Sequence, residues 1–215
     1  MGIAASHLED APSGHQRLLE AAAACFASGG YAGTSIAGIA RAAGMSKSTV
    51  FHHFPSKEAL YLAVIGEAVA DFGQRLDHAL SVSGDIATAL KIFQREHIHH
   101  MQRHRQVVRL ILRELQDPAL EHKRPLIIEL LSTNFTRLVR RLEAARQEGR
   151  VRSTANGPVA ALVLFATNAF FFQHAGELAE LPGLQLTDSP DDFAEAVIDV
   201  LYNGLAPQDT NGAET

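Results

Sequence analysis

The chain of 215 residues is 47% hydrophobic and carries a formal net charge of -5, a composition typical of a soluble globular protein with a substantial core. Membrane spans are excluded because Asn168, Gln173 and His174 interrupt the best apolar stretch before it reaches about 18 residues, and the N-terminus lacks a signal peptide. We therefore expect a cytoplasmic protein without a membrane partner, and the single cysteine, Cys25, excludes an intrachain disulfide bond.

Charge is distributed unevenly along the chain. Residues 1–57 carry four basic and three acidic side chains, so the acidic excess belongs to the remainder. Between residues 34 and 57 there are three basic side chains and no acidic one. A locally positive surface on an acidic body suits phosphate contact and limits non-specific coating of DNA by the rest of the molecule.

Apolar residues recur at helical spacing along nearly the whole chain, without the alternation that marks strands. Glycine and proline signals divide this pattern into about nine helices. The sequence therefore predicts an all-α fold. Residues 1–13 and 207–215 are polar and lack periodicity, so we expect a flexible arm and a flexible tail.

The N-terminal region has the pattern of a helix-turn-helix. A helix predicted over 15–28 ends at a glycine pair, and Thr34 or Ser35 caps the next helix. Gly44 supplies a tight turn before a third short helix that begins at Ser46. In this third helix Val50 and Phe54 are spaced to anchor it. The residues expected to point outward are Lys47, Ser48, Thr49, His52 and His53.

Residues 34–60 closely resemble the DNA-binding signature of the TetR/AcrR family of bacterial regulators. The residues that match the family pattern are Ile39, Ala40, Ala43, Gly44, Ser46, Phe54, Ser56, Lys57 and Glu58. The resemblance implies a DNA-binding domain over 14–57, a ligand-binding and dimerisation domain over 58–206, and a homodimeric repressor released from a palindromic operator by a small-molecule inducer. The expected DNA-binding residues are Thr34, Ser35, Arg41, Ser46, Lys47, Ser48, Thr49, Phe51, His52, His53 and Lys57.

Two features depart from the family pattern. Phe51 stands where most members have a tyrosine whose hydroxyl group reaches a phosphate, so His52, His53 or Lys57 must position the DNA instead. The N-terminal arm offers only His7, with Glu9 and Asp10 nearby, whereas related arms are often basic. We assign the arm no role in DNA binding.

The segment 95–104 holds four of the eleven histidines. Extending the apolar stripe of Ile86, Leu90 and Phe93 by helical steps turns several of these side chains inward, and His99 outward. The expected pocket residues are His97, His100, Met101, His104, Asn168 and His174. Three interpretations remain open: a polar lining for an organic ligand, a metal site, or structural histidines.

For the metal interpretation, the ligands would be His97, His100 and His104, whose spacing places three nitrogen donors on one helix face, with His174 as a possible fourth donor. The segment matches no strong metal motif, so we commit to no metal. A helical metal-binding protein or enzyme built on these histidines is the alternative function.

Three long helices complete the prediction. A helix from Ser56 to about Leu80 links the DNA-binding region to the body. A helix beginning near Pro158 is apolar on almost every side, and a helix over 192–205 carries a second apolar stripe. The resemblance implies that these last two helices form a dimer interface, and an internal core helix is the alternative.

Enzyme motifs are lacking in the sequence. It has no glycine-rich phosphate loop, no Gly-x-Ser-x-Gly and no His-Glu-x-x-His. We therefore expect a regulator and not an enzyme.

Overall fold

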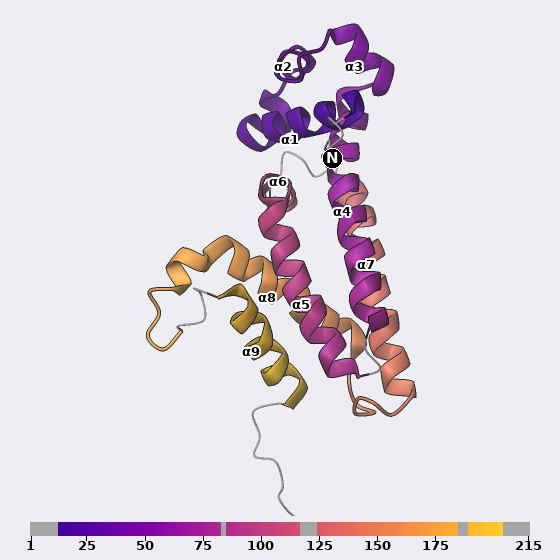
Figure 1. The fold of residues 1–215 in the computed structure, drawn as a ribbon, viewed down its shortest axis with the longest axis vertical. Coiled ribbons are helices and arrows are strands. Elements are labelled where there is room, and N and C mark those ends of the chain that lie inside the picture. The colour runs from indigo at the N-terminus through magenta and orange to yellow at the C-terminus, as the bar shows by residue number, and fades with distance from the viewer. Residues whose placement is uncertain (1–12, 83–84, 117–123, 185–188, 204–215) are drawn as a thin grey trace, which may run out of the picture. The chain divides into compact units, whose positions relative to one another are not determined.

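The computed structural model describes residues 13–82, 85–116, 124–184 and 189–203. These residues form nine α-helices and contain no strand, which confirms the predicted all-α fold (Figure 1). The helices are α1 (Gly14–Gly33), α2 (Ile36–Ala42), α3 (Lys47–His53), α4 (Lys57–Val82), α5 (Ile86–Arg103), α6 (Arg105–Gln116), α7 (Arg124–Gln147), α8 (Gly157–Leu178) and α9 (Pro190–Asn203). Except for Ser13, the predicted arm and tail lie outside the described residues.

The regular helix of α1 is interrupted at the glycine pair where we predicted its end. Its first turn is capped by the Ser13 hydroxyl group, which accepts a hydrogen bond of 3.1 Å from the backbone N–H of Gln16. At Gly30 the backbone adopts φ 69° and ψ 175°, a conformation that side chains disfavour and glycine tolerates. Gly30 therefore interrupts the helix, and a short helical segment follows it as far as Gly33.

Helices α2 and α3 form the predicted helix-turn-helix. The hydroxyl group of Ser35 caps α2 by accepting from the N–H of Gly38 at 3.1 Å, and that of Ser46 caps α3 in the same way. Between them Gly44 has a φ of 66°, which gives the tight turn. These are local interactions along the chain, and the predicted cap at Ser35 and turn at Gly44 are confirmed.

Packing divides the chain into two units, of which the first comprises the described part of Met1–Ala68 and of Gln106–Ile127. Its core is formed by fully buried side chains of α1, α2, α3 and the start of α4. These are Leu18, Ala22, Phe26, Ile39, Val50, Leu60, Tyr61 and Ile65. Phe26 and Tyr61 meet edge to face with ring centroids 5.1 Å apart, which fixes α4 against α1.

The second unit comprises Val69–Arg105 and the described part of the chain from Ile128 onward. Here α5 packs against α8 and α9. The buried core includes Phe72 and Leu76 of α4, Leu90 and Phe93 of α5, Leu138 and Leu142 of α7, Leu164 of α8 and Ile198 of α9. Several helices therefore cover α5, and this position determines the surroundings of its histidines.

Two helix boundaries differ from the prediction because serine caps precede the helices. Helix α4 begins at Lys57, since the Ser56 hydroxyl group accepts from the N–H of Ala59 at 3.0 Å. Helix α9 begins at Pro190, two residues earlier than predicted, and the Ser189 hydroxyl group accepts from the N–H of Asp192 at 3.2 Å. Residues 204 and 205, which we had placed in this helix, lie outside the described part.

Candidate functional site

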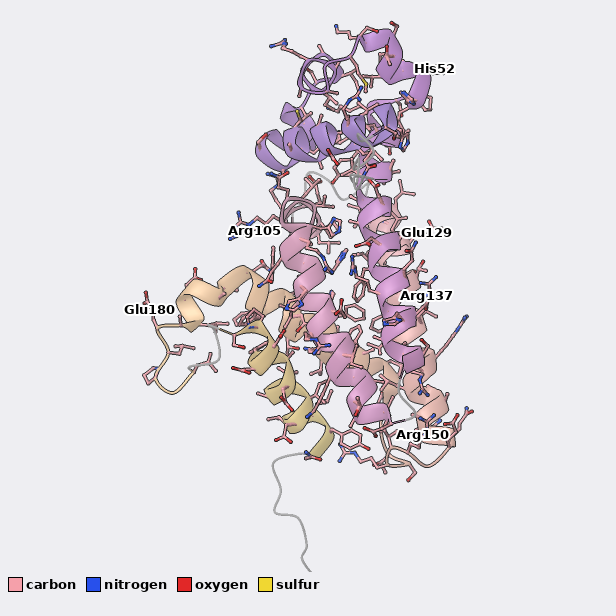
Figure 2. The ribbon with its side chains drawn as sticks, viewed as in Figure 1. His52, Arg105, Glu129, Arg137, Arg150 and Glu180 are labelled. Atoms are coloured by element: carbon pink, nitrogen blue, oxygen red, sulfur yellow. The ribbon has the colours of Figure 1, made fainter. Side chains whose placement is uncertain are left out.

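The outer face of α3 is solvent-exposed and, apart from Phe51, polar. Its exposed side chains are Lys47, Ser48, Phe51, His52 and His53. Val50 is fully buried and anchors the helix to the core, so these side chains point away from it. His52 lies on this outer surface (Figure 2). We call these five exposed residues the α3 surface.

Hydroxyl groups organise the start of α3. The Ser46 oxygen accepts from the N–H of Thr49 at 3.1 Å and lies 2.7 Å from the Ser48 hydroxyl oxygen and 2.8 Å from that of Thr49. Ser35 has the same capping role at α2. Ser35, Ser46 and Thr49, which were predicted to bind DNA, thus form hydrogen bonds that cap the starts of α2 and α3.

Positive charge accompanies the α3 surface. Arg41 is exposed in the last turn of α2, and Lys47 is exposed in the first turn of α3. No acidic side chain lies between residues 34 and 57, all of which the structure describes. The helix-turn-helix therefore exposes a positive surface without a competing carboxylate.

Thr34 faces the interior, contrary to its predicted place among the DNA-binding side chains. It is only 7% exposed, and its hydroxyl group donates toward the carbonyl oxygens of Cys25 at 2.9 Å and Gly30 at 2.7 Å. These bonds tie the end of α1 to the start of α2. Because Ser35 is the cap, Thr34 is left to brace the bend at Gly30, and its hydroxyl group is not presented to a partner.

Lys57 is also used inside the protein. Its ammonium group donates hydrogen bonds to the carbonyl oxygens of Tyr31 at 2.7 Å and Thr34 at 2.8 Å, and lies 4.3 Å from the centroid of the Tyr31 ring. Sequence reasoning assigned this charge to DNA. The structure directs it to the end of α1, because the start of α4 packs beside that end.

His15 belongs to the surroundings of the α3 surface, although sequence reasoning did not select it. Its ring centroid lies 5.8 Å from that of His53 and 5.4 Å from that of Phe54. His52 and His53 also lie with ring centroids 5.8 Å apart. The only signal in the sequence was a histidine in the first turn of α1, which by itself does not indicate contact with α3.

In the second unit, His97 of α5 is enclosed by aromatic side chains. Its ring centroid lies 4.6 Å from that of Phe72 and 4.9 Å from that of Phe165. The Asn168 side-chain nitrogen lies 2.9 Å from Nδ1 of His97, so the amide donates to the imidazole. Burial, and next the neighbouring His100, lower the pKa of His97 to about 3. His97 is therefore neutral at physiological pH.

The buried side chain of Gln94 extends the hydrogen bonding between Asn168 and His97. The Gln94 amide nitrogen donates to Oδ1 of Asn168 at 2.6 Å, and the Asn168 amide nitrogen lies 3.3 Å from the Gln94 carbonyl oxygen. Oε1 of Gln94 is fully buried and has no hydrogen-bond partner among the described residues. The sequence indicated His97 and Asn168 but not Gln94, which the structure adds as an unsatisfied acceptor.

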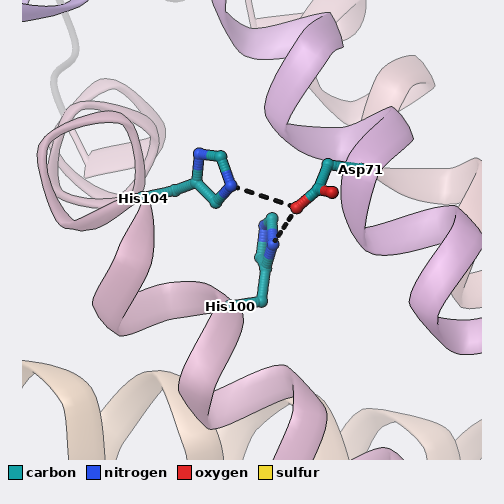
Figure 3. Close-up of side chains that lie close together, drawn as sticks. All are labelled: Asp71, His100 and His104. Atoms are coloured by element: carbon teal, nitrogen blue, oxygen red, sulfur yellow. Dashed lines mark hydrogen bonds and ion pairs between the residues drawn. The ribbon is translucent and has the colours of Figure 1, made fainter. Parts of the chain in front are cut away.

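His100 and His104 converge on a carboxylate of another helix. Oδ2 of Asp71 lies 3.2 Å from Nδ1 of His100 and 3.1 Å from Nε2 of His104 (Figure 3). Arg75, one turn along α4, donates to the same oxygen at 3.2 Å. Burial, and next His104, lower the pKa of His100 to about 4, although Asp71 opposes this shift. Burial raises the pKa of Asp71, but hydrogen bonds from Arg75 and His104 outweigh it and hold that pKa below its ordinary value.

The remaining predicted pocket residues do not join these groups. Met101 is buried, and His174 lies at a break in α8 with its ring centroid 4.7 Å from that of Phe170. The side chain of His99 is 37% exposed and lies 2.9 Å from the carboxylate of Asp191 of α9, apart from the buried histidines. The predicted grouping of His97, His100 and His104 is also divided, since His97 binds Asn168 instead of Asp71.

Helix α8 exposes a row of large apolar side chains. Those more than a third exposed are Val159, Leu162, Val163 and Phe170, and Val200 and Tyr202 add to them on α9. Among the described helices only α8 is long and apolar enough to cross a membrane by length and composition, although we expected Asn168, Gln173 and His174 to interrupt such a span. Such an apolar surface favours burial against a further partner.

Comparison with known proteins identifies relatives of the N-terminal region. Residues 18–64 match the family described as bacterial regulatory proteins, tetR family. The repressor AcnR of Corynebacterium efficiens is 44% identical over 55 residues, which are 26% of this chain and 29% of AcnR. This chain thus spans less than a third of the length of that relative. The regulator RutR of Escherichia coli K12 is 26% identical over 197 residues, 89% of this chain and 90% of RutR.

A solved structure resembles nearly the whole chain. The regulator FadR of Bacillus subtilis, in complex with stearoyl-CoA, superimposes with a TM-score of 0.69 at 18% identity and covers 88% of this chain and 98% of its own. At this identity the likeness establishes the fold, and nothing about the ligand.

Proposed function

Because residues 18–64 match the tetR family of bacterial regulatory proteins, we propose that this chain is a transcriptional repressor of that family, which binds operator DNA as a homodimer and releases it when a small molecule binds. In this proposal residues 14–57 form the DNA-binding domain and residues 58–206 the ligand-binding and dimerisation domain. The protein acts in the cytoplasm and catalyses no reaction. Its relatives AcnR and RutR are a transcriptional repressor and a transcriptional regulator.

The observation that carries the proposal is the α3 surface on a helix-turn-helix that lacks acidic side chains. Side chains of the second helix of such a motif contact base edges in the major groove, and cations beside it neutralise phosphates. We assign Lys47, Ser48, His52 and His53 to the groove. Arg41 contacts the DNA backbone, and Phe51 makes apolar contact. Ser35, Ser46 and Thr49 hold the helix ends that approach the DNA.

Two predicted residues are reassigned in this proposal. Thr34 and Lys57 position the DNA-binding helices from within the unit and do not contact DNA themselves, because their polar groups already bond to backbone carbonyl oxygens. The positive charge that contacts DNA is therefore smaller than the sequence predicted, and it is carried by Arg41 and Lys47.

We place the small molecule near the network of Gln94, His97 and Asn168. The buried, unsatisfied Oε1 of Gln94 would accept a hydrogen bond from a ligand, and the rings of Phe72 and Phe165 beside His97 favour an apolar moiety. Binding of stearoyl-CoA by FadR supports a ligand site in a protein of this fold. The inducer therefore combines an apolar body with a hydrogen-bond donor.

For the dimer, we propose that α8 and α9 pack against their copies in a second chain. The exposed apolar side chains of α8 provide apolar surface that a dimer interface would bury. A two-fold axis would place this surface of one chain against the same surface of the second chain. Two helix-turn-helix motifs would then read the two halves of a palindromic operator.

The test is direct binding of the purified full chain to DNA. Fluorescence anisotropy is measured on a labelled duplex from upstream of the coding region and on a scrambled duplex of equal length, at several salt concentrations. We expect a preference of about 1,000-fold or more for the upstream duplex and an affinity that falls steeply with salt. Equal, weak binding to both duplexes would contradict regulation of its own gene, and no binding to any genomic fragment would refute the proposed function.

A further inference from the structure

We propose that Asp71, His100 and His104 form a binding site for a divalent transition-metal ion such as Zn²⁺. Asp71 comes from the middle of α4, His100 from the last turn of α5 and His104 directly follows α5, and all three lie in the second packing unit. Each offers one ligand atom, and the three atoms lie within 4.8 Å of one another. The inference does not depend on DNA binding.

The donor set suits such an ion. Two imidazole nitrogens and a carboxylate oxygen are ligands that zinc and its neighbours bind well, and three protein ligands leave a coordination position for water or a small molecule. Softer ions favour sulfur, and calcium and magnesium favour oxygen alone. The chemistry of the set therefore selects a borderline transition metal.

The distances are close to those of a bound site. Ligand atoms about 2.0–2.1 Å from a tetrahedral zinc ion lie about 3.3 Å apart. Both pairs between Asp71 and a histidine already have nearly this separation, at 3.1 and 3.2 Å. Only the two imidazole nitrogens have to approach each other, from at most 4.8 Å. His104 directly follows the last residue of α5, with φ -98° and ψ 30°, and its ring is only partly buried, so rotation of this side chain closes the site.

Neighbouring groups hold the ligands in place. Arg75 donates to both carboxylate oxygens of Asp71 and also lies 3.8 Å from Glu96, so the carboxylate keeps its orientation. Phe72 lies against His100, with ring centroids 5.2 Å apart. Such outer contacts orient metal ligands and limit their motion. Asp71 and His100 can thus keep their positions when an ion binds.

An ion also has access from solvent. The side chain of His100 is 7% exposed, whereas those of His104 and Asp71 are 31% and 33% exposed. The site consequently has one buried wall and one open side. A position open to water distinguishes it from a purely structural zinc site, which is closed by four protein ligands.

The competing explanation is that Asp71 only accepts hydrogen bonds from two histidines. Asp71→Asn separates the two explanations, because the amide oxygen still accepts hydrogen bonds but is a poor ligand for a metal ion. His104→Ala removes one ligand at a half-exposed position. His99→Ala is the matched control, since His99 lies on the same helix and pairs with a single carboxylate, that of Asp191.

The experiment titrates ZnCl₂ into the full chain, prepared without a histidine tag and freed of metal with a chelator, by isothermal titration calorimetry. Titration with CoCl₂ follows, with the visible absorption of Co²⁺ reporting nitrogen and oxygen ligation. Circular dichroism and thermal melts establish that each variant is folded. We expect one ion per chain for the wild type and for His99→Ala. Asp71→Asn and His104→Ala should each weaken binding at least tenfold and change the Co²⁺ spectrum.

Two outcomes would overturn the proposal. One is a wild-type chain that binds neither ion in the micromolar range. The other is an Asp71→Asn chain that is folded and binds Zn²⁺ as tightly as the wild type with an unchanged Co²⁺ spectrum, which would place the ion elsewhere.

Discussion

The ammonium group of Lys57 donates a hydrogen bond of 2.7 Å to the carbonyl oxygen of Tyr31 and lies over the Tyr31 ring. The two residues are 26 positions apart and join the start of α4 to the end of α1. A lysine that family resemblance assigns to DNA thus serves as a brace within the DNA-binding unit.

We predict that Lys57→Met lowers the free energy of unfolding by about 1–3 kcal/mol and leaves the salt dependence of DNA binding unchanged. Methionine keeps an apolar stem, but the carbonyl oxygens of Tyr31 and Thr34 lose a charged donor. Urea denaturation measures the first quantity, and anisotropy titrations at several salt concentrations measure the second. A salt slope reduced by about one would mean that Lys57 contacts a phosphate after all.

Lys47→Ala should weaken DNA binding and leave the stability of the fold nearly unchanged, the opposite of Lys57→Met. The side chain is exposed at the start of α3, so its loss leaves stability within about 0.5 kcal/mol of the wild type. Loss of a base contact costs about 1–3 kcal/mol and relaxes preference at one operator position, whereas loss of a phosphate contact weakens all sequences and lowers the salt slope by about one. Arg140→Ala, an exposed change on α7, is the control. Wild-type affinity for the operator would remove Lys47 from the DNA-binding surface.

Substitutions at two adjacent phenylalanines of α8 should have different effects. Phe170 is 56% exposed, whereas Phe171 is 3% exposed and stacks on Phe193 of α9 with centroids 4.2 Å apart. Phe170→Asp is expected to give a folded monomer. Phe171→Asp should destabilise the chain by roughly 3–5 kcal/mol or more, because it empties a buried site and introduces a charge. Phe170 therefore tests the exposed row of α8, and Phe171 tests the core.

Sedimentation velocity measures the oligomeric state of these two variants, and circular dichroism measures their folding and stability. A Phe170→Asp chain that remains fully dimeric would show that the exposed row of α8 is not the dimer interface. A Phe171→Asp chain with the stability of the wild type would contradict the packing of α8 against α9.

Stability should decrease as the pH falls through the acidic range because of His97. An unfolded chain protonates this histidine below its ordinary pKa of 6.5, whereas burial keeps the folded chain unprotonated to about pH 3. The unfolded state therefore binds more protons between these values. The free energy of unfolding decreases as the pH is lowered, by up to about 1.4 kcal/mol per pH unit for this group.

Urea denaturation of the wild type and His97→Gln at a series of pH values between about 7 and 4 measures this effect. The variant should show a shallower dependence, reduced by one titrating group. His100, with a pKa of about 4, retains a contribution of the same sign in both proteins. His99→Gln serves as the control. Parallel curves for wild type and His97→Gln would mean that His97 is not the buried neutral group.

The amino-acid sequence alone determined the helix-turn-helix of this protein. Its caps at Ser35 and Ser46 and its turn at Gly44 are made by contacts between residues a few positions apart, so local spacing specifies them. Val50 and the α3 surface follow from the same periodicity, because a helix that is buried on one side must expose the other.

Tertiary structure alone decided where charged and polar side chains of distant segments meet. The periodicity of α5 indicates which histidines turn inward, but it carries no information about the helix that faces them. Asp71 therefore became the partner of His100 and His104, and Asn168 that of His97, only when α4 and α8 packed against α5. Lys57 likewise binds the carbonyl oxygen of Tyr31 because packing places the end of α1 within reach of its long side chain.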